Sequence, residues 1–192
     1  MMIGENRALK AYNFYKTNKP CIFLSHRSLD KNMVIEIGHY IMKAGIDIYL
    51  DEYDQNLQVA AEVGDDRAIT QYIQKGIEES SHIMCLLSPS TVGSWWVPYE
   101  IGFGEKAGKE IASLKLKSLS DDDIPSYIKI RKCLRNIRDL NNYLEEIVYS
   151  YTKYPLKEFD YSKIHEYSQY SNASIIKESY YYHPLTNYLE RG

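Results

Sequence analysis

The chain alternates short apolar runs with amphipathic stretches, and this alternation predicts a parallel sheet covered by helices. Residues 21–25 (CIFLS) and 82–87 (HIMCLL) are apolar almost throughout, as is typical of central strands buried on both faces. Residues 46–50 alternate apolar and polar side chains, which predicts an edge strand with one wetter face. We expect a fourth strand at residues 111–116 and a short fifth strand within residues 127–134.

Segments whose apolar residues recur at helical spacing lie between and after these strands. Residues 30–44 place apolar side chains on one helical face, and Gly45 supplies the stop. Residues 66–79 repeat this pattern, and residues 139–151 do so with Asp139 as the expected N-cap. The chain is therefore expected to fold as an α/β protein.

The order of the strands also follows from their patterns. A first strand in the middle, a second at the edge and a third back in the middle match the order 2-1-3-4-5 of a flavodoxin-like three-layer sandwich. Ligands of such sheets bind beyond the carboxyl ends of the first and third strands. The loops there are residues 25–28 (SHRS) and 88–90 (SPS), which are rich in hydroxyl groups, and Arg27 adds a guanidinium that suits phosphate oxygens.

An aromatic ring and a carboxylate lie one helical turn apart in the stretch that follows the third strand. Trp96 and Glu100 are four positions apart, so a helix places them on one face. Pro98 is tolerated only in a first turn, which puts the helix start near residues 94–96 with Ser94 as a candidate cap. Glu100 then lies near the positive end of the helix, which favours its ionised form.

Composition narrows the possible classes of protein. With 192 residues, of which 44% are hydrophobic and 26% charged, the chain has the size of one globular domain with an extension. A net charge of -3 gives no electrostatic reason to expect nucleic acid or an anionic membrane as a partner. We expect a cytoplasmic protein, because neither a transmembrane span nor a secretory signal is evident. Cys21, Cys85 and Cys133 are predicted to be free thiols, the first two buried, rather than disulfides or metal ligands.

Four sequence blocks occur in an order that carries a family resemblance: IFLSHRSLDK, IDIYLDEYD, HIMCLLSPST and WVPYE. The chain resembles the Toll/interleukin-1 receptor (TIR) domain, especially the bacterial, Thoeris-type members that consume NAD and signal in anti-phage defence. The resemblance covers roughly residues 19–151. It leaves residues 1–18 as an N-terminal extension and residues 152–192 as a tyrosine-rich C-terminal extension packed on the domain.

The resemblance implies cleavage of the nicotinamide–ribose bond of NAD, with NAD as the substrate and no further cofactor or metal. Glu100 falls on the family's catalytic carboxylate, and Trp96 falls on the tryptophan that offers a flat surface to the nicotinamide ring. Residues 51–64 correspond to a mobile loop that helps to close or assemble the site across a neighbouring subunit. The further residues expected at the dinucleotide are Ser25, His26, Arg27, Ser28, Asp51 and Ser88.

Several outcomes and partners remain open at this point. Attack by water would give ADP-ribose, attack by the substrate's own groups a cyclic product, and attack by an outside group a conjugate. We expect self-association, a separate effector protein that senses the product, and a phage-derived activator. Two alternatives are a non-catalytic TIR interaction module and a glycosidase resembling nucleoside deoxyribosyltransferases. The non-functional interpretation of the pair is that Glu100 is a solvated helix residue and Trp96 a core residue. Trp95 is expected to pack rather than to act in catalysis.

The C-terminal extension contains too much apolar and aromatic surface for a disordered tail. We expect it to fold back over a flank of the sheet or a dimer face. A sharper hypothesis brings His183, Pro184 or a nearby tyrosine such as Tyr180 into the active site, where it would exclude water and steer the product away from hydrolysis.

Overall fold

Five parallel strands form the centre of the molecule, in the spatial order β2-β1-β3-β4-β5. The computed structural model describes residues 3–9, 19–152 and 183–192. Every neighbouring pair of strands is parallel, which confirms the predicted flavodoxin-like order 2-1-3-4-5. The strands are β1 (Cys21–Ser25), β2 (Asp47–Tyr49), β3 (His82–Leu87), β4 (Glu110–Lys115) and β5 (Lys132–Leu134).

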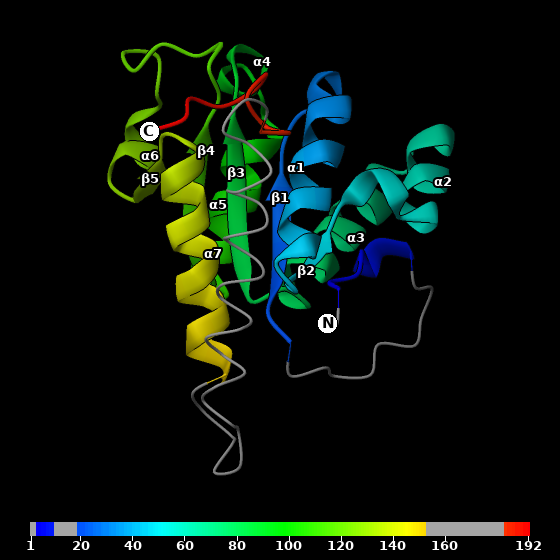
Figure 1. The fold of residues 1–192 in the computed structure, drawn as a ribbon. Coiled ribbons are helices and arrows are strands. Elements are labelled where there is room, and N and C mark those ends of the chain that lie inside the picture. The colour runs from blue at the N-terminus through cyan, green and yellow to red at the C-terminus, as the bar shows by residue number, and fades with distance from the viewer. Residues whose placement is uncertain (1–2, 10–18, 153–182) are drawn as a thin grey trace.

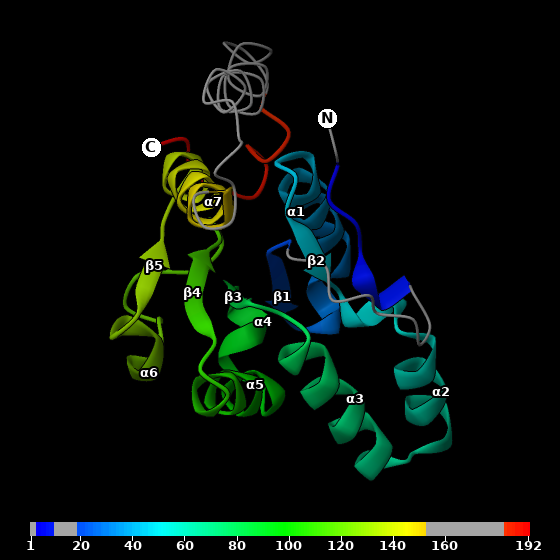
Figure 2. The same ribbon diagram turned by 90° about the horizontal axis from the view of Figure 1, so that it is seen from below.

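Helices cover both faces of this sheet (Figure 1). Figure 2 shows α1 (Lys31–Lys43) and α7 (Ile137–Thr152) on one face, with α3 (Asp66–Glu78) and α5 (Trp96–Lys106) on the other. This is the predicted three-layer sandwich. The shorter elements are η1 (Arg7–Leu9), η2 (Ser28–Asp30), η3 (Asp51–Tyr53), α2 (Gln55–Val63), α4 (Pro89–Val92) and α6 (Ser126–Lys129).

Each face of the sheet has its own apolar core. Leu24 and Met84 belong to the core under α1 and α7. Phe23 and Cys85 belong to the core on the side of α3 and α5. Because successive strand residues point to opposite faces, Ser25 points to the same side as Phe23. The last residue of β1 therefore faces the layer that contains α5.

The edge strand β2 is more enclosed than its sequence pattern predicts. The side chains of Asp47 and Tyr49 are both buried, so the predicted wetter face is wrong. Residues 3–9 run beside β2 through a parallel bridge from Asn6, and Arg7 forms an ion pair with Asp47 at 3.0 Å. The edge is covered by a segment about 40 positions earlier in the chain.

Helix α7 begins two residues before its predicted N-cap. The side-chain oxygen of Asn136 accepts a hydrogen bond from the backbone N–H of Asp139 at 2.8 Å, so Asn136 takes the capping role predicted for Asp139. The carboxylate of Asp139 instead accepts from the backbone N–H of Arg135 at 2.9 Å. The predicted inward face is confirmed, since Leu140, Leu144 and Ile147 are buried.

Helix α5 lies close to the sheet because residue 104 is glycine. A Cβ atom on Gly104 would lie 2.0 Å from Cδ1 of Ile83 in β3, so any other residue would require the fully buried Ile83 side chain or the helix to shift. Gly108, with a φ of 69°, ends the turn that follows the helix. These two glycines fix the height of α5 over β1 and β3, and with it the position of Glu100 one turn before Gly104.

Residues 183–192 return to the sheet on the side of α1 and α7, where they appear in red in Figure 1. Leu185 and Leu189 are fully buried there, and Nε2 of His183 lies 3.1 Å from the hydroxyl oxygen of Tyr40 in α1. This end of the chain covers a flank of the sheet, and His183 lies on the face opposite α5. Residues 153–182, with Tyr180, lie outside the described residues, and the boundaries of the two extensions stay predictions.

The three cysteines are free thiols. Cys21 and Cys85 are buried and Cys133 is half-buried, which confirms the prediction for the first two. Within the ranges that the structure describes, no helix is long and apolar enough to cross a membrane.

Candidate functional site

The side chain of Glu100 lies buried between α5 and the carboxyl end of β1. Helix α5 begins at Trp96, which confirms the predicted start. The N-cap is Trp95 rather than the predicted Ser94, although the Ser94 hydroxyl still accepts a hydrogen bond from the backbone N–H of Val97 at 3.3 Å. Glu100 is only 3% exposed, which excludes the alternative of a solvated helix residue. A carboxylate this deeply buried requires a partner, and its partners define the candidate site.

Ser25, the last residue of β1, is that partner. Its hydroxyl donates a hydrogen bond to Oε2 of Glu100 at 2.6 Å, between two buried side chains. Parallel pairing sets Ser25 opposite Cys85 of β3, and the Cys85 thiol interacts with the Ser25 hydroxyl and with the charge of Glu100. Since paired residues of neighbouring strands point to one face, these three side chains form a polar cluster beneath α5.

The pKa of Glu100 is raised to about 8: burial is the largest cause, the negative charge of Asp51 adds to it, and the hydrogen bond from Ser25 opposes both effects. Burial also raises the pKa of the Cys85 thiol, with a smaller contribution from Glu100. The prediction that the helix end favours ionised Glu100 is wrong, because desolvation outweighs a dipole worth about 1 kcal/mol. Glu100 is thus mostly protonated at neutral pH in this arrangement, and a cationic group beside it would favour the ionised form.

His26 and Asp51 form a second polar pair at this end of the sheet. Nδ1 of His26 lies 2.9 Å from the carbonyl oxygen of Leu24 and 3.7 Å from Oδ1 of Asp51. A carbonyl oxygen only accepts, so Nδ1 carries the proton. Burial raises the pKa of Asp51, and His26 opposes the shift. Because Asp51 also acts on Glu100, this pair and the Ser25–Glu100 pair are electrostatically coupled.

The segment after β2 contains two short helices, η3 and α2, at the place where the family resemblance implies a mobile loop. The carboxylate of Asp54 caps α2 by accepting from the backbone N–H groups of Asn56 at 3.0 Å and Leu57 at 3.2 Å. Lys31 of α1 forms an ion pair with Glu52 at 2.6 Å. These contacts hold the segment against the start of α1, and its role at a subunit contact stays a prediction.

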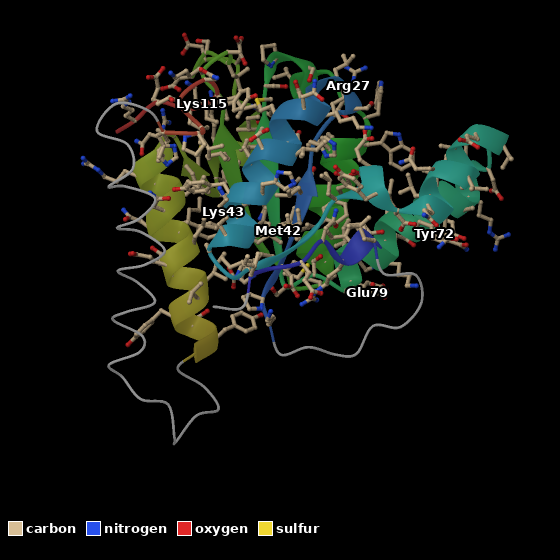
Figure 3. The ribbon with its side chains drawn as sticks, turned by 45° about the vertical axis from the view of Figure 1, so that its right-hand side comes forward. Arg27, Met42, Lys43, Tyr72, Glu79 and Lys115 are labelled. Atoms are coloured by element: carbon tan, nitrogen blue, oxygen red, sulfur yellow. The ribbon has the colours of Figure 1, made fainter. Side chains whose placement is uncertain are left out.

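The two hydroxyl-rich loops meet, and part of their hydrogen-bonding capacity is already used. Ser88 is buried; its hydroxyl donates to Asp30 at 2.6 Å and accepts from the backbone N–H of Ser90 at 3.1 Å. Arg27 donates to the backbone carbonyl of Ser90 at 3.2 Å. Figure 3 shows Arg27 at the carboxyl end of the sheet. Arg27 and Ser28 are exposed, so these two of the predicted phosphate contacts can reach a ligand from solvent.

The two adjacent tryptophans differ in their surroundings. Trp95 is 92% exposed, so the prediction that it packs is wrong. Trp96 is 40% exposed and meets the ring of Tyr99 edge-on, with the ring centroids 5.9 Å apart. Tyr99 is itself held by a hydrogen bond of 2.6 Å from Gln74. Trp96 is therefore a supported ring with an open surface rather than a core anchor.

Sequence reasoning missed two residues of this region. Asp30 was expected only to start a helix, yet its carboxylate accepts from the hydroxyls of Ser88 and Ser90. Nothing local signals this contact, because Ser88 lies 58 positions away. Cys85 was assigned only as a buried thiol. The signal that could have found it is its position in β3: successive residues of a strand point to opposite faces, and Cys85 points to the face that α5 covers.

A separate hollow of about 500 Å³ lies between α1 and the N-terminal segment. Its lining includes Asn6, Ile35, Met42 and Tyr53. Figure 3 shows Met42 and Arg27 near opposite ends of α1. Glu100 and its partners do not line this hollow, so the candidate site is assigned from its chemistry and not from its volume.

Together these residues suit an elongated ligand that carries phosphate and a flat ring. Arg27 and Ser28 offer exposed donors for phosphate oxygens, and Trp96 offers a surface for a ring. The buried carboxylate of Glu100 is hydrogen-bonded to Ser25, the first residue of the same loop, and lies one helical turn from Trp96. Among the side chains that the structure describes, no group of three or more His, Cys, Asp or Glu residues is arranged to hold a metal ion.

Comparisons with known proteins agree with the fold. The model of the TIR domain family matches residues 22–145. A curated protein of Bacillus cereus (strain MSX-D12), the probable 3′ cyclic ADP-D-ribose synthase ThsB′, is 27% identical over 126 residues. This similarity covers 62% of the present chain and 64% of the relative, so the chain spans just under two thirds of that protein's length.

Proposed function

Because the chain belongs to the TIR domain family, we propose that it cleaves the bond between nicotinamide and ribose in NAD and makes an ADP-ribose-derived signal. The observation that carries this proposal is the buried carboxylate of Glu100, bonded to Ser25 one helical turn from the half-exposed Trp96. The similarity to a probable 3′ cyclic ADP-D-ribose synthase supports the same chemistry.

Glu100 acts on the charge that develops at the ribose. As the glycosidic bond breaks, both of its electrons pass to the positively charged nicotinamide ring, which leaves as a neutral base and needs no acid. The ribose becomes oxocarbenium-like, and an ionised carboxylate beside it stabilises the positive charge. The cationic ring also lowers the pKa of Glu100 as NAD binds, so the ionised form becomes available at neutral pH.

The other residues hold the dinucleotide across the carboxyl ends of β1 and β3. Trp96 covers the nicotinamide ring and excludes water from part of the site. Arg27 and Ser28 bind the phosphates, and His26 and Asp51 lie at the ribose side. Ser88 completes the rim of the site beneath the phosphates.

The product that we favour is a cyclic ADP-ribose. A ribose hydroxyl of the adenosine half attacks the anomeric carbon that nicotinamide has left, a C–O bond forms, and the hydroxyl proton passes to solvent. The printed name of the Bacillus cereus relative specifies such a product with a 3′ linkage. Cyclisation requires that water stays away from the anomeric carbon, which fits a site whose carboxylate is 3% exposed.

We place this product in a signalling pathway of anti-phage defence. A separate effector protein would sense the cyclic nucleotide, and assembly of several copies of the chain, triggered by a phage-derived activator, would complete the site. In this view no metal and no cofactor take part, and NAD is the substrate.

Liquid chromatography with mass spectrometry of NAD incubated with the purified protein tests the proposal, alone and in lysate of phage-infected cells. Wild type should release nicotinamide, and Glu100→Gln should not. Glu105→Gln is the matched control, because Glu105 lies exposed on the same helix and pairs only with Arg131 at 2.7 Å among the contacts described. A cyclic product is one water lighter than ADP-ribose.

Intact NAD in every sample, including infected lysate, would overturn the proposal and favour the interaction module. Release of a base from deoxynucleosides, with NAD intact, would favour the nucleoside glycosidase.

A further inference from the structure

We infer that Ser25 is a positioning residue for the reaction: it holds Glu100 by one carboxylate oxygen and so leaves the other to act on the ribose. This inference rests on the proposed function, in which Glu100 is the catalytic carboxylate. It gives Ser25 a different role from the contact with NAD that the sequence suggested.

Burial separates Ser25 from the two outer residues of its loop. Its side chain is 1% exposed, whereas Arg27 and Ser28 of the same loop are exposed. Its single hydroxyl proton is already donated to Oε2 of Glu100 at 2.6 Å. A bound dinucleotide would meet Glu100 before it met Ser25, so the serine acts through the carboxylate.

Ser25 also stands on a rigid element. It ends the central strand β1, which pairs with β2 on one side and with β3 on the other, and the pairing with β3 extends to Ser25 itself. Groups carried by paired strands are held more precisely than groups on loops. A short hydrogen bond from such a strand restricts both the position and the rotation of the Glu100 carboxyl group.

The two oxygens of Glu100 therefore have different roles. Oε2 accepts from Ser25, while no donor among the described residues reaches Oε1. A carboxylate has lone pairs on both oxygens and accepts from more than one donor. With Oε2 tied to the strand, Oε1 is the oxygen that meets the ribose hydroxyl or the developing positive charge.

The hydrogen bond also sets how readily Glu100 ionises. The Ser25 hydroxyl favours the carboxylate over the acid and lowers the pKa of Glu100 against the effect of burial. Removing the hydroxyl therefore raises that pKa and leaves less of the active, ionised form at neutral pH.

The test is the pH dependence of NAD cleavage in Ser25→Ala, in Ser25→Thr and in a matched control. Ser113→Ala is that control: Ser113 is also 1% exposed, and it lies opposite Cys85 on β4, where its hydroxyl is 3.5 Å from the backbone carbonyl of Lys132. In Ser25→Ala the rising limb of kcat against pH should move up by about one pH unit. This shift corresponds to the loss of one charge-assisted hydrogen bond to the ionised form of Glu100.

At pH values on the rising limb, the same variant should lose about tenfold in kcat, with KM for NAD unchanged. Ser25→Thr, which keeps the hydroxyl, should restore both the limb and the rate. Ser113→Ala should retain the wild-type limb. A serine that merely packs would lower the thermal midpoint of Ser25→Ala and leave the limb where it is.

The outcomes separate this inference from the proposed function. If wild type releases no nicotinamide, the proposed function fails. A carbon-13 titration of the Glu100 carboxyl group, without NAD, then still reports whether Ser25→Ala raises its pKa. If wild type cleaves NAD but Ser25→Ala has the wild-type limb and a raised KM, Ser25 is a substrate contact and the inference is overturned. Should Ser25→Ala not fold, Ser25→Cys, with its weaker donor, is expected to show a smaller upward shift, and an unshifted limb would again overturn the inference.

Discussion

Two buried polar clusters lie on opposite faces of the same sheet, and they differ in how completely their groups are paired. The Glu100 cluster (Ser25, Cys85 and Glu100) lies beneath α5. The His183 cluster (Tyr40, Asn141 and His183) joins α1, α7 and the C-terminal residues on the other face. Both clusters are buried, yet only the Glu100 cluster contains an acid whose pKa is raised to about 8.

In the His183 cluster donors and acceptors match. Nδ1 of His183 accepts from the backbone N–H of Leu185 at 3.1 Å, so the proton resides on Nε2, which donates to the oxygen of Tyr40 at 3.1 Å. The Tyr40 hydroxyl donates in turn to the side-chain oxygen of Asn141 at 2.6 Å. Burial lowers the pKa of His183, with a smaller contribution from Arg191, and the neutral ring is the form that this network requires.

In the Glu100 cluster one hydroxyl supports a carboxyl group whose pKa is raised to about 8. The contrast shows that two buried polar networks of one fold can have different roles, one in stability and one in catalysis. A fully paired network stabilises the fold, whereas a buried acid kept near its ionisation point marks a place where chemistry is expected.

The largest expected effect is that of Glu100→Gln. Removing the charge that stabilises the ribose should lower the rate of NAD cleavage at least about a thousandfold, as for loss of the main electrostatic group of a site. The same change should raise the thermal midpoint by about 5 °C, because an amide is less costly to bury than an acid that must ionise as the pH rises.

Calorimetry and the nicotinamide assay, run on the same preparation, check both outcomes. A variant that is both inactive and less stable would indicate that Glu100 is a structural residue, and the contrast between the two clusters would then fail.

A second change, His183→Ala, should have the opposite profile. It removes the partner of the Leu185 N–H group and of Tyr40, which costs about 2 kcal/mol and lowers the thermal midpoint by about 5 °C. The rate of NAD cleavage per folded molecule should stay within about twofold of wild type, since the cluster lies across the sheet from α5. A large loss of rate at unchanged stability would instead place His183 in the active site.

The sheet could be predicted from the sequence because its signals are local. The apolar runs at residues 21–25 and 82–87 and the alternation at residues 46–50 specify central and edge strands without reference to the rest of the chain. The spacing of Trp96 and Glu100, with Pro98 to mark the helix start, likewise gave the candidate carboxylate.

The contacts of the site could not be predicted, because each depends on how distant elements pack. The bond between Ser25 and Glu100 spans 75 positions and requires the close approach of α5 that Gly104 allows. The burial of Asp47 depends on Arg7, 40 positions earlier. The helix dipole suggested an ionised Glu100, and only the depth of burial, which no local pattern records, reverses that expectation.

The paired tryptophans test how far the Glu100 cluster extends toward solvent. Trp96→Ala should lower kcat/KM for NAD about tenfold, through the loss of a stacking surface at the rim of the site. Trp95→Ala is the matched control. The Trp95 ring is 92% exposed, so its removal should leave kcat/KM within about twofold of wild type. Steady-state kinetics on both variants decide the question, and equal losses would show that exposure does not distinguish the two rings.

The smallest expected effect is a difference between the two clusters in how their contribution to the thermal midpoint depends on pH. The pKa of Glu100 is raised from 4.5 to about 8, so its acid form stabilises the fold at low pH, and this stability is lost as the pH rises through about 8. Glu100→Gln does not titrate, and its advantage in thermal midpoint over wild type should grow between pH 5 and about 8.

The pKa of His183 is lowered from 6.5, so its neutral ring contributes stability above pH 6.5 that is lost as the pH falls through the lower folded pKa.

The deficit of His183→Ala should therefore shrink below pH 6.5, while the gain of Glu100→Gln also shrinks toward pH 5. Near pH 5 both variants approach wild type, and near pH 8 they diverge from it in opposite directions. Scanning calorimetry of the three proteins in buffers from pH 5 to about 8.5 measures this divergence, because the two groups titrate in overlapping ranges with opposite effect. Midpoints that stay a constant interval apart at every pH would show that neither group changes its protonation on folding, and the contrast between a paired and an underpaired cluster would lose its electrostatic basis.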